Sequence, residues 1–109
     1  MTISKLAREL ELVKLTSGEY EDKKIASCYI SDMLSRVLGG CTTNGVLITV
    51  QTSLNMVAVA VMTEAACVIL PEGLSISDSV TEKADEEGLA IFSSQETAFT
   101  LATKIASLL

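Results

Sequence analysis

The sequence predicts a single α/β domain with a mainly parallel, mixed sheet of about five strands and helices on its faces. From residue 25 onward, short apolar runs rich in β-branched residues alternate with segments of helical periodicity, joined by short connections. This alternation is typical of a parallel sheet covered by helices. A length of 109 residues fits one domain, residues 1–109, and the apolar share of 49% supports a core and excludes disorder.

The central stretch, residues 46–70, predicts a strand–helix–strand unit. Val46–Val50 is an apolar, mostly β-branched run that suits a strand buried on both faces. A helix is expected over Leu54–Ala66, and a second buried strand over Cys67–Leu70, stopped by Pro71. Two such strands joined by a helix form a parallel, right-handed crossover.

Three elements are expected before this unit. Thr2–Leu10 has the apolar spacing of a short amphipathic helix, with Thr2 or Ser4 as its cap. Glu11–Thr16 alternates as an edge strand would, and we expect it to be antiparallel or peripheral. Ile25–Ile30 is the next strand.

A helix is then expected over Met33–Leu38, ended by Gly39–Gly40 in a left-handed conformation. Asn44–Gly45 predicts a turn before the central unit.

The C-terminal part continues the alternation. A helix is expected over Ser77–Glu87, capped by Ser77 or Ser79 and closed by Gly88. Leu89–Phe92 predicts a short buried strand. Ser93 and Glu96 have the spacing of a capping box for the last helix, which runs to the C-terminus.

Charge and cysteine usage exclude several classes of protein. A net charge of −6 argues against binding to nucleic acid or to an anionic membrane surface. Charges interrupt the N-terminal ten residues where a signal peptide needs an apolar core, so we expect a cytoplasmic protein. The three cysteines are widely spaced and there is no histidine, which predicts buried apolar thiols and neither a metal site nor a cofactor.

Polar side chains gather where the predicted parallel strands end, which is the edge where such sheets bind ligands. We expect a small anionic ligand to bind six of them: Ser31, Asp32, Thr49, Gln51, Thr52 and Asn55. Helix starts offer free N–H groups and partial positive charge to such a ligand. Helix capping alone is the alternative for each residue. No nucleotide-hydrolase, dinucleotide or serine-hydrolase motif is present, so we assign no catalytic residue.

The predicted helix over residues 54–66 is apolar around its whole circumference from Met56 to Met62. Such a helix is normally buried on every side. A second copy of the chain is the simplest cover, which predicts a homodimer. Neighbouring helices of the same chain are the alternative.

Four segments resemble the DRTGG domain family: Tyr29–Asp32, Gly45–Thr49, Gln51–Ala60 and Ala66–Leu70. The resemblance covers nearly the whole chain. That family is similar to the N-terminal domain of HPr kinase/phosphorylase and, more distantly, to that of Mur ligases. The resemblance implies an α/β domain with a mixed sheet. Since stand-alone members often accompany iron-only hydrogenases, it also implies a hydrogenase-related protein as a partner.

These observations favour a regulatory module that senses a small anionic ligand or nucleotide and is not an enzyme. The alternative is an interaction domain without a ligand, which docks through acidic residues such as Glu82, Asp85, Glu86 and Glu87. Catalysis, the third hypothesis, would have to depend on Asp32, Ser31 or a cysteine.

Overall fold

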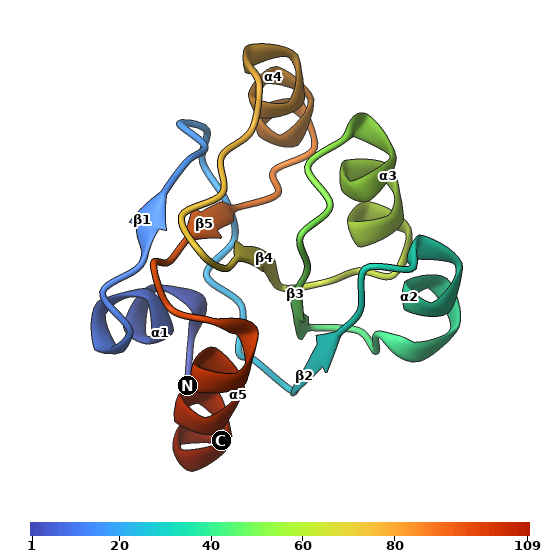
Figure 1. Cartoon of the computed structure of the whole chain (residues 1–109). Coiled ribbons are helices and arrows are strands. Elements are labelled where there is room, and N and C mark those ends of the chain that lie inside the picture. Colours follow the sequence, from blue (N-terminus) through green and yellow to red (C-terminus); the bar gives the residue numbers. More distant parts are fainter.

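The computed structural model describes all 109 residues and contains one sheet of five strands with helices on both faces (Figure 1). Along the sheet the strands lie in the order β1-β5-β4-β3-β2. The elements in chain order are α1 (Ile3–Glu9), β1 (Val13–Lys14), β2 (Ser27–Ile30), α2 (Leu34–Gly40), β3 (Gly45–Ile48), α3 (Leu54–Met62), β4 (Cys67–Leu70), α4 (Asp78–Glu86), β5 (Ile91–Ser93) and α5 (Ala98–Leu108).

The sheet has the mixed topology that the sequence predicts. Strands β2 to β5 are parallel to their neighbours, and β1 pairs with β5 in the antiparallel sense at the edge of the sheet. The peripheral antiparallel strand expected over Glu11–Thr16 is therefore confirmed, although only Val13–Lys14 pair regularly. The parallel pairing brings the carboxyl ends of β2 to β5 to one edge.

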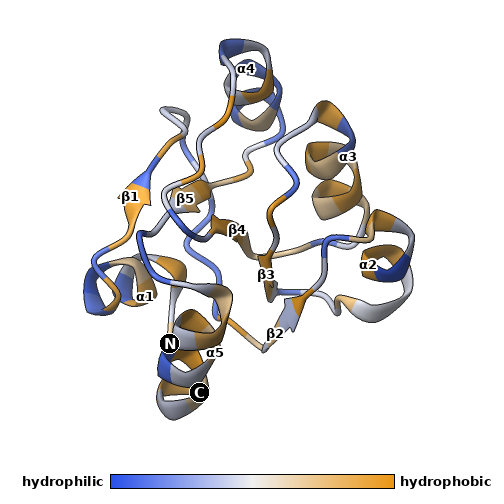
Figure 2. Ribbon diagram, viewed as in Figure 1, coloured by the Kyte–Doolittle hydropathy of each residue, from blue (hydrophilic) through white to orange (hydrophobic).

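Burial of both faces explains why β3 and β4 are continuous apolar runs. Side chains of successive residues point to opposite faces of a strand. Accordingly, Leu47 joins the core under α2, α3 and α4, whereas Val46 and Ile48 join the core under α1 and α5. Figure 2 shows β3 and β4 in apolar colours, surrounded by helices that carry both apolar and polar turns. No helix has both the length and the apolar composition needed to cross a membrane.

The turn predicted at Asn44–Gly45 is present, with Asn44 at a φ of 63°, and Gly88 closes α4 at a φ of 68°. The expectation for Gly39–Gly40 was wrong. Both glycines lie inside α2, neither has a positive φ, and Cys41 ends the helix in an extended conformation. Gly40 serves packing instead, because a Cβ at this position would overlap the Tyr29 ring.

Two predicted helix boundaries were also wrong. Helix α3 ends at Met62 instead of Ala66, because Glu64 adopts a φ of 56° and turns the chain toward β4. The last helix begins at Ala98, where the Thr97 side chain accepts the N–H of Thr100, so no capping box forms at Ser93. The chain between β5 and α5 is instead a turn.

A carboxylate of α4 fixes the loop that follows β1. The N–H groups of Gly18 and Ser17 donate to Asp85 Oδ1 at 2.8 and 3.1 Å, and the Ser17 hydroxyl donates to Asp85 Oδ2 at 2.9 Å. The hydrogen bond from Gly18, followed by those from Ser17, holds the pKa of Asp85 below its usual range. Asp85 is thus a structural residue of the acidic helix.

The pH dependence of stability tests this role. Because the pKa of Asp85 is lower in the folded chain, its contribution is complete above the ordinary carboxyl pKa of about 4 and is lost as the pH falls through the folded value. Asp85→Asn is expected to lower the free energy of unfolding in urea at neutral pH, and the difference from wild type should shrink progressively as the pH falls below about 4. Glu82→Gln, on the same helix, is the control. If Asp85→Asn lowers the free energy of unfolding as much at acidic pH as at neutral pH, the prediction is contradicted.

Candidate functional site

The six predicted ligand residues do come together in space. Ser31 and Asp32 follow β2, and residues 49–55 follow β3, its parallel neighbour. The Ser31 N–H donates to the Ile48 carbonyl at 3.3 Å, so the two chain segments stay adjacent beyond the paired residues. We call this set the polar rim: Ser31, Asp32, Thr49, Gln51, Thr52 and Asn55.

Hydrogen bonds within the chain link three of these residues into a network. Asp32 Oδ1 accepts the Val50 N–H at 2.9 Å and the Thr49 hydroxyl at 3.4 Å. Gln51 Nε2 donates to the Asp32 carbonyl at 2.9 Å, and the Gln51 N–H donates to Thr49 Oγ1 at 3.2 Å. Thr49 is only 1% exposed. These contacts fix the shape of the rim.

Ser31 has a local structural role. Its hydroxyl oxygen accepts the N–H of Met33 at 3.2 Å, immediately before α2. This bond closes a local turn and does not cap α2, whose N-cap is Met33 without a side-chain capping bond, so the capping alternative for Ser31 was wrong.

Thr52 and Asn55 differ from the other four, because their side chains make no hydrogen bond within the chain. Thr52 is half-buried and Asn55 is exposed. Ser53, the N-cap of α3, makes no side-chain capping bond, and the N–H groups of Leu54 and Asn55 have no acceptor within the chain. The first turn of α3 therefore presents unpaired donors, the arrangement that binds anions at helix starts.

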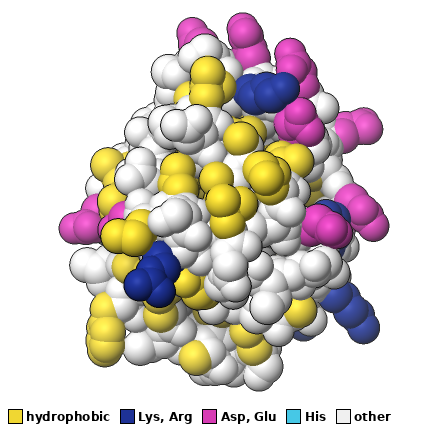
Figure 3. All heavy atoms as spheres, turned by 90° about the vertical axis from the view of Figure 1, so that its right-hand side faces the viewer, with side chains coloured by type: hydrophobic (Ala, Val, Ile, Leu, Met, Phe, Trp, Pro, Cys, Tyr) yellow, Lys and Arg dark blue, Asp and Glu magenta, His cyan; other side chains and the backbone are white.

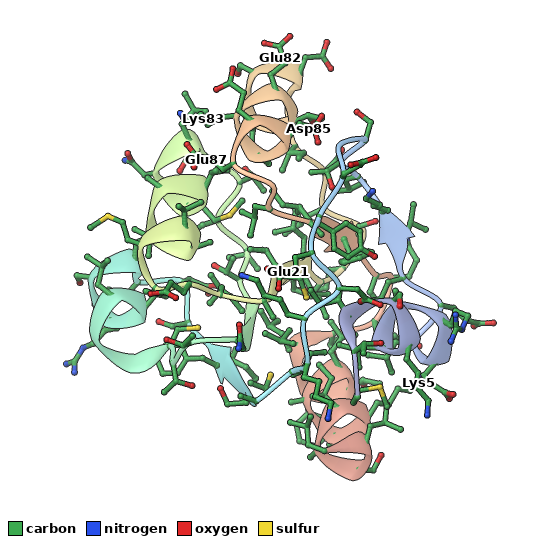
Figure 4. The ribbon with its side chains drawn as sticks, turned by 180° about the vertical axis from the view of Figure 1, so that it is seen from behind. Lys5, Glu21, Glu82, Lys83, Asp85 and Glu87 are labelled. Atoms are coloured by element: carbon green, nitrogen blue, oxygen red, sulfur yellow. The ribbon has the colours of Figure 1, made fainter.

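The polar rim is an open surface in the single chain. The two hollows of the structure, of about 440 and 110 Å³, have no rim residue in their walls. They adjoin each other at the opposite edge of the sheet, where Ala66 precedes β4 and Leu89 precedes β5. Figure 4 shows the molecule from behind and labels Glu21 and Glu87, two of the residues that line these hollows.

These hollows were not predicted from the sequence. Their walls combine the charged segment around Tyr20 with the end of α4, including Glu19, Glu21, Lys23 and Glu87. Only the topology brings the two segments together, and no motif in the sequence indicates it.

The three cysteines are free thiols, of which Cys41 and Cys67 are buried and Cys28 is half-buried. Burial raises the pKa of Cys67 to about 12 and that of Cys28 to about 11, and it also raises the pKa of Cys41. Thiols with such values are protonated at neutral pH and are weak nucleophiles. No three acidic or thiol side chains converge in a way that would hold a metal ion.

Asp32 is expected to matter for the rim independently of any ligand. Asp32→Ala removes the acceptor of the Val50 N–H and should lower the free energy of unfolding by about 1 kcal/mol. Asp32→Asn keeps an oxygen acceptor and should recover part of the loss. Urea titration of the three proteins checks this. A wild-type midpoint for Asp32→Ala would show that the network does not contribute to stability.

The fold and the rim together define a small α/β domain with a polar surface at the carboxyl edge of its sheet. The chain belongs to the DRTGG domain family, whose sequence model matches residues 5–108. No curated protein matches the sequence.

Among solved structures, the chain is similar to the CBS and DRTGG domains of the regulatory region of Clostridium perfringens pyrophosphatase, solved in complex with the activator diadenosine tetraphosphate. The TM-score is 0.71, the sequence identity is 12%, and the match covers 94% of this chain and 44% of that chain. The similarity confirms the predicted fold. The chain spans less than half of the length of that regulatory region.

Proposed function

We propose that this domain is a non-catalytic regulatory module that senses a small anionic ligand at the polar rim. The observation that carries the proposal is the first turn of α3, where unpaired N–H groups lie beside the free side chains of Thr52 and Asn55. The network around Asp32 holds this turn at the carboxyl edge of a parallel sheet, the edge at which such sheets bind ligands.

The charge of Asp32 favours a nucleotide over a simple anion. The N–H groups suit phosphate oxygens, but a carboxylate in the same rim repels a ligand that consists only of phosphate. Asp32 Oδ2 has no hydrogen-bond donor within the chain. A nucleotide offers both kinds of group, since its phosphates accept hydrogen bonds and its ribose hydroxyls or base amino groups donate them. The dinucleotide activator of the similar pyrophosphatase region supports this class of ligand.

The proposed setting of the module is a cytoplasmic homodimer. A hydrogenase-related protein is the first partner to test, because the chain resembles members that accompany iron-only hydrogenases. In this scheme ligand binding at the rim changes the affinity of the module for that partner.

Thermal unfolding with added nucleotide tests the ligand site. Diadenosine tetraphosphate, ATP and inorganic phosphate are the probes, and a nucleotide should raise Tm increasingly with its concentration. Thr52→Ala combined with Asn55→Ala should weaken binding about tenfold, which corresponds to about 1.4 kcal/mol. Both side chains are free of internal bonds, so the fold should be unaffected.

Thr43→Ala is the matched control, since Thr43 is exposed and lies in the loop before β3, at the other edge of the sheet. Its nucleotide response should equal that of wild type. The site assignment fails if the Thr52/Asn55 double variant responds like the control.

An interaction domain without a ligand is the second candidate, supported by the acidic side chains around α4 in Figure 3. The structure reduces the free charge on this helix, because Asp85 binds the Ser17 loop and Lys83 lies 3.7 and 3.2 Å from Glu86 and Glu87. Partner capture that falls steeply as salt rises, without any nucleotide effect, would favour this function.

A further inference from the structure

Helix α3 carries an exposed apolar ridge. Leu54, Ala58 and Met62 are spaced four residues apart, and all three are exposed, Leu54 at 49% and Met62 at 71%. Residues four apart lie on one side of a helix, so these three form a single line along α3. Nothing in the chain covers this line, although α2 and α4 pack on either side of α3.

The ridge is part of a larger apolar surface. Nine large hydrophobic side chains are exposed, and six of them come from the segment that runs from the last residue of β2 to the last residue of α3: Ile30, Met33, Leu38, Val50, Leu54 and Met62. Figure 3 shows hydrophobic side chains gathered on the face formed by α2 and α3, with most acidic side chains above and to the right. Protein–protein interfaces have the same distribution, with an apolar centre surrounded by charged and polar side chains.

We infer that a second copy of the chain docks on this ridge, with a two-fold axis through Ala58. Along the ridge the side chains are large at Leu54, small at Ala58 and large at Met62. A second copy in antiparallel orientation therefore places Leu54 against the partner's Met62, and the two small Ala58 side chains meet where the helices cross. Helices in globular proteins most commonly pack through ridges formed by residues spaced four apart. A surface that is complementary to itself in this way closes as a dimer.

Electrostatics favour the same arrangement. Two copies with a net charge of −6 each repel one another unless the contact lies away from most of their carboxylates. Arg36 of the neighbouring helix α2 is exposed, makes no ion pair within the chain and is free to meet a carboxylate of the partner. Antiparallel α3 helices also place the carbonyl end of one helix beside the amide end of the other.

The docked copy would complete the polar rim, and this second step rests on the proposed ligand-sensing function. Apolar and polar residues interleave there: Met33 follows Asp32, Val50 lies between Thr49 and Gln51, and Leu54 lies between Ser53 and Asn55. The rim of a single chain is open. A partner helix that covers Leu54 supplies the missing wall next to Asn55 and Thr52.

The mass of the full chain in solution tests the docking. Wild type should have twice the mass of the 11.6 kDa chain, and Ala58→Glu and Met62→Glu should each have the mass of one chain. Phe99→Glu on α5 is the matched control, since Phe99 is 78% exposed on the opposite face of the sheet, and it should stay dimeric.

Cross-linking tests the symmetry. With a mild oxidant, Ala58→Cys should form a disulfide-linked dimer, because the new thiol lies on the axis and meets its own copy. Met62→Cys should remain uncross-linked, because the axis sets this position against Leu54. A monomeric wild type, a dimeric Ala58→Glu or a cross-link at Met62→Cys but not at Ala58→Cys would overturn the proposed interface.

Nucleotide titration separates the two steps. In dimeric wild type, diadenosine tetraphosphate should raise Tm, and in monomeric Ala58→Glu the apparent affinity should fall at least tenfold. An unchanged affinity in the monomer would refute completion of the rim by the partner. A dimer whose nucleotide response survives the Thr52 and Asn55 substitutions would refute the ligand site and leave the interface supported.

Discussion

The structure depends on the burial of the β3–β4 pair on both faces. No residue of either strand is exposed, and successive side chains pack alternately into two separate hydrophobic cores. At about 25 cal/mol per Å² of buried apolar surface, the burial of this pair contributes substantially to the stability of a chain with few aromatic residues. The two cores also oblige the helices to lie on both faces, and the polar segments that follow the strands are thereby left at the edges of the sheet.

In the polar rim, one carboxylate fixes the path of the chain that leads to the proposed ligand-binding turn. Asp32 holds Val50 through its side chain and Gln51 through its main chain, so the segment that leads into α3 has a fixed path. Preorganisation of this kind lowers the cost of ordering a loop when a ligand binds. The hydrogen-bond donors that remain unpaired lie in residues 52–55, which take no part in the network around Asp32.

Periodicity in the sequence was sufficient to predict the sheet, the antiparallel edge strand and the alternation with helices. It failed where a local conformation depends on distant residues. The glycine pair after α2 looks like a helix stop, but Gly40 is there to admit the Tyr29 ring, a contact between elements. The start of α5 was misplaced because Ser94 is buried and binds the N–H of Glu96 in a turn.

The candidate site was predictable in position but not in form. The parallel order of β2 and β3 brings Asp32 to Thr49 and Val50 as expected, yet no pattern in the sequence reveals that the rim is open or that hollows form at the other edge. Open or closed shape depends on how side chains from several elements meet, and a sequence read one segment at a time lacks that information.

The position of Cys67 has a practical consequence. Its side chain lies in β4 with no exposed surface, at the centre of the sheet. A reagent in solvent reaches this sulfur only after the packing around β4 opens, so the rate of its modification depends on the opening of this core as well as on the reactivity of the thiol. Modification of Cys67 in the purified protein, assigned separately from that of the half-buried Cys28, therefore serves as a natural probe of unfolding.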